Sequence, residues 1–565
     1  MLKLCRINPN LQSDHVWRDD LEFYIPQICN YFVFHEELNN QQLKDFLKES
    51  GKISYFFAHN LFFYLRSISQ TIEKQKIQDL ILVWDVLEEF YTIFSQHFYC
   101  QQLNTNHIIK QLQINKVNIF DEKTQLQQQQ QEQNLYGSMQ TEEEQSLNFK
   151  QIKMQNYIEQ DIFGITNDNL KKEYMKDGFI STICFFNDII EISNILKDAD
   201  PKIISLIHEL TKINQQLPAN IYIPFLKKSI RNHVVLNIVT SECKVFSSKE
   251  RSPYYICLEI FRPEELFDLS SEQTYIEEKN KNGITQQIKW LYDYILSLPI
   301  TLETGDNIKQ EQFAIQLIQQ FHQIFKMEDL NIKLTPYEIV SMGPTSGIIE
   351  MIKDSVTLAD LKKNIYTYYK EISDLNNFFE VFYGDDLKKA QKNLISSLVG
   401  YSLVCYFLQI KDRHNGNILL HKEGHIIHID FGFFLSNAPG KGIAFEQNVP
   451  FKLLSEYIQI FGGVESKLFQ KFRKLFFKGF QAACKHQDKI LILVKMLYSG
   501  HGTTLPCFQK GELCIQELVQ RFNPPNVTND GDLSIHCNML INQSLDNWRA
   551  RWYDKWQYFC QGIFY

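Results

Sequence analysis

Apolar residues at three- and four-residue spacing, the pattern of amphipathic helices, fill two long stretches of the chain. The first covers residues 17–112, with LEFYIPQICNYFVF (21–34) as an example, and the second covers 176–217. Between them, residues 125–148 are rich in glutamine and acidic side chains, and such a segment has too little apolar surface to fold. The pattern therefore predicts a helical region that is interrupted by a disordered linker or insertion.

From about residue 220 the pattern changes to β-branched and aromatic runs between turn residues, such as HVVLNIV and YYICLEIF. A helical segment follows over 305–325, then the strand-like runs YEIVSM and GIIEMI, and helical spacing returns from about 355. We therefore predict an α+β fold in which an all-helical accessory region precedes a bilobal, kinase-like catalytic domain. The predicted segments are 1–120 (helical accessory), 121–155 (glutamine-rich linker), 156–219 (helical accessory, continued), 220–353 (sheet-rich small lobe) and 354–565 (helical large lobe).

One short interruption of the helical pattern, KDRHNGNILLHKEGHIIHIDFGF (411–433), carries the candidate chemistry. The strand-like runs ILL (418–420) and IIHI (426–429) flank a KEG turn, so they predict a β-hairpin. Such a hairpin would bring Asn417 and Asp430 side by side. One amide oxygen and one carboxylate, completed by waters and phosphate oxygens, suit Mg²⁺. Solvated polar residues around an ordinary turn are the alternative.

Composition narrows the class of protein. A chain of 565 residues, 44% of them hydrophobic, is large enough for two to four domains. Its 58 basic and 66 acidic side chains give no overall signal for nucleic acid binding. It has no apolar run of membrane-spanning length, no signal-peptide pattern at its start and no C-x-x-C pair among its 12 cysteines. We expect a soluble intracellular protein whose membrane role is at most peripheral. P-loop, Rossmann and protein-kinase H-R-D motifs are absent from the sequence.

The sequence DRHNGN followed by IIHIDFG resembles the catalytic and activation-loop signature of the phosphatidylinositol 3- and 4-kinases, and the type III beta phosphatidylinositol 4-kinases are the most similar subfamily. The resemblance extends over most of the chain. Further similar segments are FSSKERSPYYICLEI (246–260), TPYEIVSMGPTSGIIE (335–350), LVGYSLVCYFLQIKDRHNGNILL (398–420), TTLPCF (503–508) and WYDKWQYFCQGI (552–563), with weaker similarity in LEFYIPQICNYF (21–32) and LPANIYIPF (217–225).

The resemblance implies a role for each matching residue. Asp412 and His414, with Arg413 between them, would orient and deprotonate the attacking inositol hydroxyl. Asn417 and Asp430 would hold Mg²⁺, or Mn²⁺ in its place, on the phosphates of ATP. The residues implied in ATP binding are Ser247, Ser248 and Lys249 of a phosphate-covering loop, Glu311, and Tyr337, Ile349, Glu350, Ile352 and Ile429 around the adenine.

The segment that would face the lipid, 430–454, includes Phe431 and Gly432 and carries only two cations, Lys441 and Lys452. A denser basic patch would be needed to pair with the extra phosphates of an already phosphorylated lipid. The sparse charge therefore favours unphosphorylated phosphatidylinositol, unless the charge of this loop carries no information about the substrate.

One position departs from the family pattern. Our alignment puts Glu303 where the family has a lysine that reaches the ATP phosphates, whereas the usual partner of that lysine, Glu311, is kept. At about 4 Å with an effective dielectric near 20, a pair of unit charges interacts by roughly 4 kcal/mol, so this exchange of sign matters. Another cation (Lys249, Lys289 or Lys309) substitutes, or the strand register differs, or activity is weak or absent.

The final segment, 546–564, places Trp548, Trp552, Trp556 and Phe559 on one helical stripe between cationic residues. This pattern predicts a helix that docks on a membrane surface, and a helix packed on the large lobe is the alternative. A second segment, 466–480, carries four lysines on one face, which indicates either membrane attraction or ordinary solvation.

Three functions follow from these observations. The first is a lipid kinase that makes phosphatidylinositol 4-phosphate from ATP at the cytosolic face of an organelle membrane. We expect this membrane to be of the Golgi type. The second is a pseudokinase scaffold of the same fold, supported by Glu303, and the third is an atypical serine/threonine kinase. Expected partners are membrane phosphatidylinositol and a small GTPase or adaptor at the helical region, and no nucleic acid.

Overall fold

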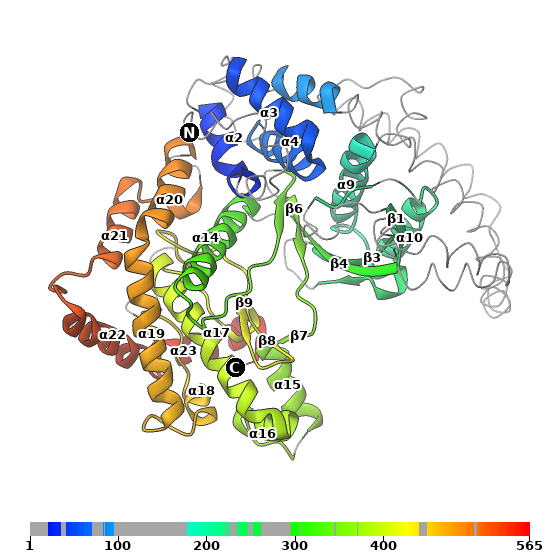
Figure 1. Cartoon of the computed structure of the whole chain (residues 1–565). Helices are drawn as coiled ribbons and strands as arrows, with labels where there is room; N and C mark the ends of the chain where they lie inside the picture. The colour runs from blue at the N-terminus through cyan, green and yellow to red at the C-terminus, as the bar shows by residue number, and fades with distance from the viewer. Residues whose placement is uncertain are drawn as a thin grey trace, which may run out of the picture. The chain divides into compact units, whose positions relative to one another are not determined.

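The computed structural model of the chain (Figure 1) describes residues 21–34, 41–69, 83, 85–94, 178–217, 219, 221–224, 234–246, 252–261, 295–304, 307–343, 346–369, 371–439, 449–501 and 505–564. The chain divides into two compact units. Unit 1 comprises Met1–Ser13, Leu38–Thr304 and Ser346–Ile348, and unit 2 comprises Asp14–Glu37, Gly305–Thr345 and Ile349–Tyr565.

Unit 1 combines helices with an antiparallel sheet. Its helices are α3 (Gln41–Ile53), α4 (Tyr55–Ser69), α9 (Gly178–Ile195) and α10 (Lys202–Asn214), and its strands are β1 (Val234–Ile238), β2 (Lys244–Val245), β3 (Tyr254–Phe261) and β4 (Ile295–Thr304). Strand β3 pairs with β1 and β2 and, along its whole length, with β4, from Tyr254 opposite Leu302 to Phe261 opposite Ile295. The β-branched and aromatic runs of the sequence therefore form the predicted sheet.

The helices α9 and α10 pack on this sheet through two polar contacts. Asn214, at the end of α10, exchanges hydrogen bonds of 2.8 and 2.7 Å with the carbonyl and amide of Ile238 in β1. The buried Tyr254 of β3 donates its hydroxyl proton to the carbonyl of Ile189 in α9 at 2.5 Å. The predicted boundary at residue 219 thus separates helices from strands that share one compact unit.

Unit 2 is mostly helical. Its helices are α2 (Ile25–Phe34), α14 (Ile308–Met327), α15 (Leu358–Tyr368), α16 (Leu375–Tyr383), α17 (Leu387–Leu408), α18 (Ser455–Ile460), α19 (Lys467–Lys485), α20 (Gln487–His501), α21 (Glu512–Phe522), α22 (Asp530–Ser544) and α23 (Trp548–Gln561). Its strands are β5 (Ile339–Ser341) and the sheet β7 (Ser355–Thr357), β8 (Ile418–His421) and β9 (Ile426–His428), while β6 (Ser346–Glu350) is shared by the two units.

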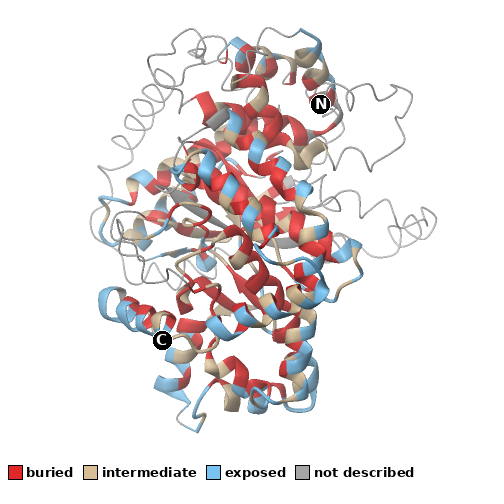
Figure 2. Ribbon diagram, turned by 90° about the vertical axis from the view of Figure 1, so that its left-hand side faces the viewer, coloured by how far each residue is buried: buried red, intermediate tan, exposed pale blue. Residues whose placement is uncertain are grey.

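Helix α17 lies at the centre of the unit 2 core. Its Phe407 ring stacks on Phe522 of α21 at 4.5 Å between centroids and on Phe321 of α14 at 5.8 Å. Gly479 lets α19 approach α17 closely, because a Cβ atom there would lie 2.5 Å from Cδ1 of Leu403. The helices carry buried and exposed residues on different sides (Figure 2), which is the amphipathic arrangement that the sequence periodicity predicts.

Helix α2 belongs to unit 2 although it comes from the start of the sequence. Gln27 exchanges side-chain hydrogen bonds of 2.7 and 2.8 Å with Gln316 of α14, and Gln316 also donates to the carbonyl of Phe23 at 2.6 Å. Asn30 donates to the carbonyl of Leu497 in α20 at 3.1 Å. The helix itself was predictable, but its partners lie more than 280 residues away along the chain.

The predicted fold class is confirmed, since helices precede a mixed region of small antiparallel sheets and helices. The helix expected over 305–325 is α14, the strand-like run YEIVSM contains β5, and the run GIIEMI overlaps β6. The glutamine-rich segment 125–148 lies outside the described residues. Within the described part of the chain, we find no helix with the length and apolar character needed to cross a membrane.

Candidate active site

The predicted hairpin is present and forms one wall of the candidate site. Strands β8 and β9 pair antiparallel with Ile418 opposite His428, and the amide of Ile429 donates to the carbonyl of Asn417 at 3.1 Å. Asn417 directly precedes β8, and Asp430 follows two residues after β9. Both side chains therefore start from the same open end of the hairpin, as the sequence predicts.

The loop before the hairpin holds Asp412 in a left-handed backbone conformation, with φ of 62°. A non-glycine residue in this region is uncommon and persists when its surroundings fix it. Here the side-chain amide of Asn417 donates to the carbonyl of Asp412 at 3.0 Å, and the amide of Lys411 donates to the carbonyl of Phe433 at 2.9 Å. The loop is therefore tied both to the hairpin and to the segment that follows it.

Arg413 is buried and donates hydrogen bonds to the backbone of this site. Its guanidinium donates to the carbonyls of Lys411 (2.9 Å) and Ile429 (2.7 Å) and to the carbonyl of Asp430. It also lies over the ring of Phe431 at 5.3 Å. Because the guanidinium donates to these main-chain oxygens, Arg413 holds the backbone at Asp430 in place.

His414 lies beside Asp412 as a neutral imidazole. Its Nδ1 accepts a hydrogen bond from the amide of Gly416 at 3.1 Å, so the ring proton belongs on Nε2, which is 3.7 Å from Oδ1 of Asp412. Burial lowers the pKa of His414 to about 3, and the nearby charges of Arg413 and Lys452 act in the same direction. The imidazole therefore stays uncharged at neutral pH and presents a donor to the carboxylate.

The open end of the hairpin offers donors that suit a hard cation. The nitrogen of the Asn417 amide faces the carbonyl of Asp412, which assigns its oxygen to the opposite side. The exposed carboxylate of Asp430 accepts the amide of Gly432 at 3.3 Å. In the ranges that the structure describes, no three His, Cys, Asp or Glu side chains gather as a metal cage. An amide and a carboxylate oxygen fit Mg²⁺ that completes its shell with waters and phosphates.

Helix α23 contributes side chains that the sequence patterns did not assign to the site. The hydroxyl of Tyr553 donates to Oδ1 of Asp412, and Nε2 of Gln557 donates to the same oxygen at 3.3 Å. Gln557 also donates to the hydroxyl oxygen of Tyr553 at 2.6 Å. A polar face at spacing i, i+1 and i+4 on an aromatic-rich helix is the signal that would have found these residues.

Lys452, expected to face the lipid, is instead buried beneath α23. Its Nζ lies 2.7 Å from Oδ1 of Asp554, and the two side chains are 5% and 7% exposed. The ammonium also donates to the side-chain oxygen of Asn415 at 3.2 Å. In this arrangement the charge of Lys452 pairs with Asp554 inside the protein, and a contact of Lys452 with the substrate stays a prediction.

The part of the chain that forms this site is similar to known proteins. Residues 297–509, which include the whole hairpin, match the family described as Phosphatidylinositol 3- and 4-kinase. This chain contains a phosphatidylinositol 3- and 4-kinase domain. The fold prediction and the resemblance found in the sequence are thereby confirmed for this part of the chain.

Curated relatives give the same result. The chain is 43% identical over 269 residues to a phosphatidylinositol 4-kinase of Dictyostelium discoideum, which is 47% of this chain and 22% of that protein. It is 42% identical over 271 residues to phosphatidylinositol 4-kinase beta 1 of Arabidopsis thaliana (47% and 23%) and 36% identical over 269 residues to phosphatidylinositol 4-kinase beta of Sorex araneus (47% and 32%). The matched part of the chain thus spans between about a fifth and a third of these relatives.

The described residues predicted around the adenine all belong to unit 2. The buried Tyr337 lies just before β5, and its hydroxyl donates to the carboxylate of Glu311 in the first turn of α14 at 3.1 Å. The backbone and carboxylate of Glu350 bond to Glu338, at 2.9 and 3.1 Å. Three aliphatic side chains are partly buried against the core: Ile349, Ile352 and Ile429.

The first turn of α14 braces the segment after Asp430. Gln310 donates to the carbonyl of Gly432 at 2.6 Å and accepts the amide of Cys507 at 2.7 Å. Its neighbour Lys309 is buried, and this burial lowers the pKa of its ammonium to about 7. A lysine held in this way titrates near neutral pH.

Several predicted residues lie outside the described part of the chain: Ser247, Ser248, Lys249, Lys289 and Lys441. Glu303 lies on β4, and its side chain is not described. Their roles stay predictions.

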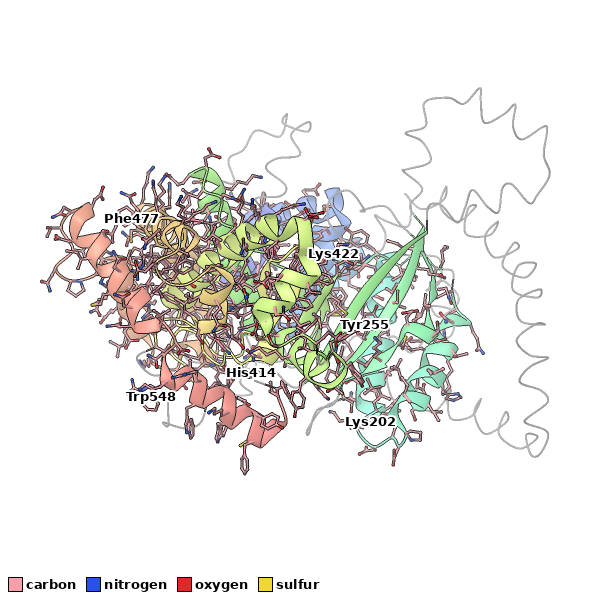
Figure 3. The ribbon with its side chains drawn as sticks, turned by 90° about the horizontal axis from the view of Figure 1, so that it is seen from below. Lys202, Tyr255, His414, Lys422, Phe477 and Trp548 are labelled. Atoms are coloured by element: carbon pink, nitrogen blue, oxygen red, sulfur yellow. The ribbon has the colours of Figure 1, made fainter. Side chains whose placement is uncertain are left out.

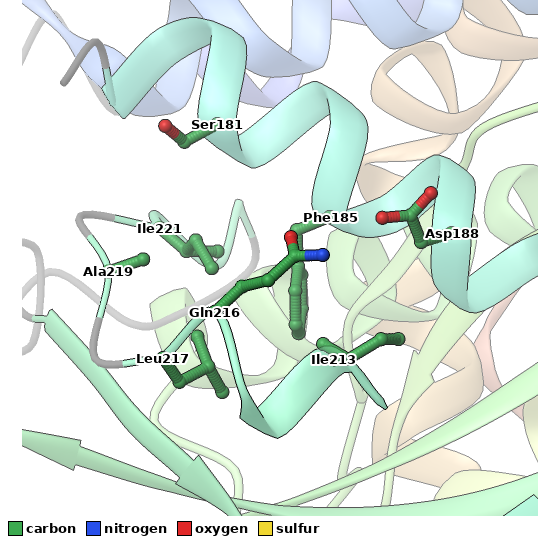
Figure 4. Close-up of a pocket in the computed structure, with 8 residues that line it drawn as sticks. All are labelled: Ser181, Phe185, Asp188, Ile213, Gln216, Leu217, Ala219 and Ile221. Carbon is green, nitrogen blue, oxygen red and sulfur yellow. The ribbon is translucent and has the colours of Figure 1, made fainter. Parts of the chain in front are cut away.

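Unit 1 holds a separate small cavity of about 20 Å³ (Figure 4). It lies between α9, which supplies Ser181, Phe185 and Asp188, and the end of α10 with the segment after it. Burial, reinforced by the neighbouring Glu191, raises the pKa of Asp188 to about 7. A cavity of this size holds about one water and is too small for a nucleotide.

Proposed function

We propose that this protein is a lipid kinase that transfers the γ-phosphate of ATP to the 4-hydroxyl of phosphatidylinositol, giving phosphatidylinositol 4-phosphate. The observation that carries the proposal is the open end of the β8–β9 hairpin, where the side chains of Asn417 and Asp430 start and Asn417 donates to the carbonyl of Asp412, within the region that matches the family. The 4-position is proposed because the relatives are named phosphatidylinositol 4-kinases.

Each residue then has a specific task. Asn417 and Asp430 would hold the divalent cation, whose charge neutralises the phosphate oxygens of ATP. Asp412 would accept the proton of the attacking inositol hydroxyl. Neutral His414 would donate from Nε2 towards that carboxylate, and Arg413 would keep the start of the Asp430 segment in place. Phosphoryl transfer depends mainly on positioning and charge stabilisation, which is what these contacts provide.

The outer face of α23 supports a membrane-bound substrate. Trp548 and Phe559 are 64% and 89% exposed, and Trp552 and Trp556 are exposed as well. Arg551 and Lys555 lie exposed among these aromatic residues. Such a face suits the boundary between lipid headgroups and acyl chains. The four lysines of α19 (Lys467, Lys471, Lys474 and Lys478) are also exposed, which fits both of their predicted roles.

The deciding experiment is an ATP-dependent assay on phosphatidylinositol vesicles with Mg²⁺, in which the position of the new phosphate is determined. We expect phosphatidylinositol 4-phosphate from the wild type and none from Asp430→Asn, which keeps the size of the side chain but removes the charge that would hold the metal. Substantial turnover by this variant would reject the metal assignment. A wild type that binds ATP without making product would favour the pseudokinase, whose support is Glu303.

A further inference from the structure

We infer that Tyr553 and Gln557 of α23 form a clamp that positions the Asp412 carboxylate for the reaction. The inference rests on the proposed kinase function and adds the C-terminal helix to the machinery of the active site. Neither residue is expected to touch the substrate, so both are positioning residues.

The clamp is a connected set of hydrogen bonds on one carboxylate oxygen. Tyr553 donates to Oδ1 of Asp412, Gln557 donates to the same atom at 3.3 Å, and Gln557 supports the tyrosine hydroxyl with a second hydrogen bond of 2.6 Å. Both side chains are 3% exposed. Because water has little access, these contacts are stronger than they would be at the surface.

The chemistry of the donors fixes their orientation. Both hydrogens of the Gln557 amide nitrogen are used, one on Asp412 and one on Tyr553. Turning the amide over would place its oxygen against a carboxylate, which only accepts hydrogen bonds. The tyrosine hydroxyl therefore accepts from Gln557 and donates to Asp412, so the chain of bonds has a single direction.

The backbone of Asp412 is held independently of this clamp. Its carbonyl accepts from Asn417, and its φ is positive. The side-chain torsions remain to be set, and the hydrogen bonds from α23 act on them. Oδ1 is thus shared by Tyr553 and Gln557, and Nε2 of His414 lies 3.7 Å from the same oxygen. A small error in the position of a reacting group lowers turnover by about a hundredfold, so this clamp has kinetic consequences.

Two faces of one helix thus serve two surfaces. In Figure 3 the helix α23 starts at Trp548, and the loop with His414 lies next to it. The face with Tyr553 and Gln557 meets the catalytic loop, while the face with Trp548 is exposed. The clamp can therefore be tested apart from membrane binding if the lipid is presented in soluble form.

The test uses Tyr553→Phe, which removes one hydroxyl and keeps the ring, and Tyr558→Phe as the matched control on the exposed side of the same helix. Both are assayed with a short-chain, monomerically dispersed phosphatidylinositol. We expect kcat of Tyr553→Phe to fall ten- to a hundredfold while KM for ATP stays within twofold, and Tyr558→Phe to match the wild type. Gln557→Met should have a smaller effect, and the double variant should lose less than the product of the two single effects because the two residues are bonded to each other and to one carboxylate oxygen.

Hydrogen exchange of residues 411–417 provides a readout that does not depend on turnover. Exchange should rise in Tyr553→Phe and not in Tyr558→Phe. A kcat within twofold of wild type in Tyr553→Phe overturns the positioning role, and so does a fall in kcat that comes with faster exchange along all of α23. A wild type that forms no lipid product rejects the proposed function instead, and unchanged exchange at 411–417 would then reject the clamp separately.

Discussion

The buried ion pair between Lys452 and Asp554 makes a quantitative prediction about stability. Its atoms are 2.7 Å apart, and the side chains are 5% and 7% exposed, so water screens the charges poorly. Replacing Asp554 by leucine leaves the Lys452 ammonium buried, with the side-chain oxygen of Asn415 as its remaining acceptor among the described residues. Loss of one partner from such a pair destabilises by about 3–5 kcal/mol.

The double replacement Lys452→Met with Asp554→Leu should behave differently. Apolar residues of similar size remove both desolvation penalties, and such exchanges are often neutral or stabilising. The remaining loss is the hydrogen bond to Asn415, worth about 1 kcal/mol. We therefore expect the double variant to be more stable than either single variant, a reversal that additive surface effects cannot produce.

Thermal unfolding followed by tryptophan fluorescence is a suitable assay. Of the 6 tryptophans in the chain, Trp548, Trp552 and Trp556 lie on α23 itself and report on its release. For a unit of this size we expect Asp554→Leu to lower Tm by roughly 10 °C. The exposed pair Lys422–Asp354, also 2.7 Å apart, is the matched control, and Asp354→Asn should leave Tm nearly unchanged. Equal changes in Tm for Asp554→Leu and Asp354→Asn would refute the burial of the Lys452–Asp554 pair.

Three further predictions concern other parts of the chain. Asp188→Asn should raise Tm more at pH 8 than at pH 5. The folded-state pKa of about 7 lies above the usual value of 3.8, so the penalty for the buried carboxylate grows as pH rises between these values and is complete above the higher one. Glu303→Lys should raise kcat/KM for ATP about tenfold if Glu303 faces the phosphates, and a value within twofold would reject that alignment. Deletion of residues 125–148 should leave Tm and turnover nearly unchanged, and a large loss of either would assign that segment a structural role.

Local patterns were enough to predict the hairpin. Strands β8 and β9 follow from β-branched runs on both sides of a turn, and their register follows from the short connection between them. Asn417 and Asp430 are brought to one end by this local geometry alone. The placement of these two side chains at one end of the hairpin was therefore predictable from about twenty consecutive residues, and their binding of a metal stays a prediction.

Long-range pairing was not predictable in the same way. The sequence shows Lys452 as one of two cations in a sparse loop, but its burial depends on Asp554, about a hundred residues later. Likewise, the apolar stripe of α23 dominates the pattern of this helix. The role of its polar face with Tyr553 becomes visible only in the structure, where Asp412 lies against it. Side-chain contacts between distant elements depend on tertiary packing, which periodicity does not encode.

The distribution of residues on α23 is the reverse of an ordinary surface helix. Its buried face carries Tyr553, Asp554 and Gln557, all of them hydrogen-bonded, while its exposed face carries Trp548 and Phe559. Polar contacts fix the register of this face, since a shift by one residue would remove the partner of a buried charge. Large aromatic side chains that gather on one exposed face are typical of an interaction surface, and a membrane is the apolar partner that we propose for this face. In the proposed function, α23 would thus face the lipid on one side and hold Asp412 on the other.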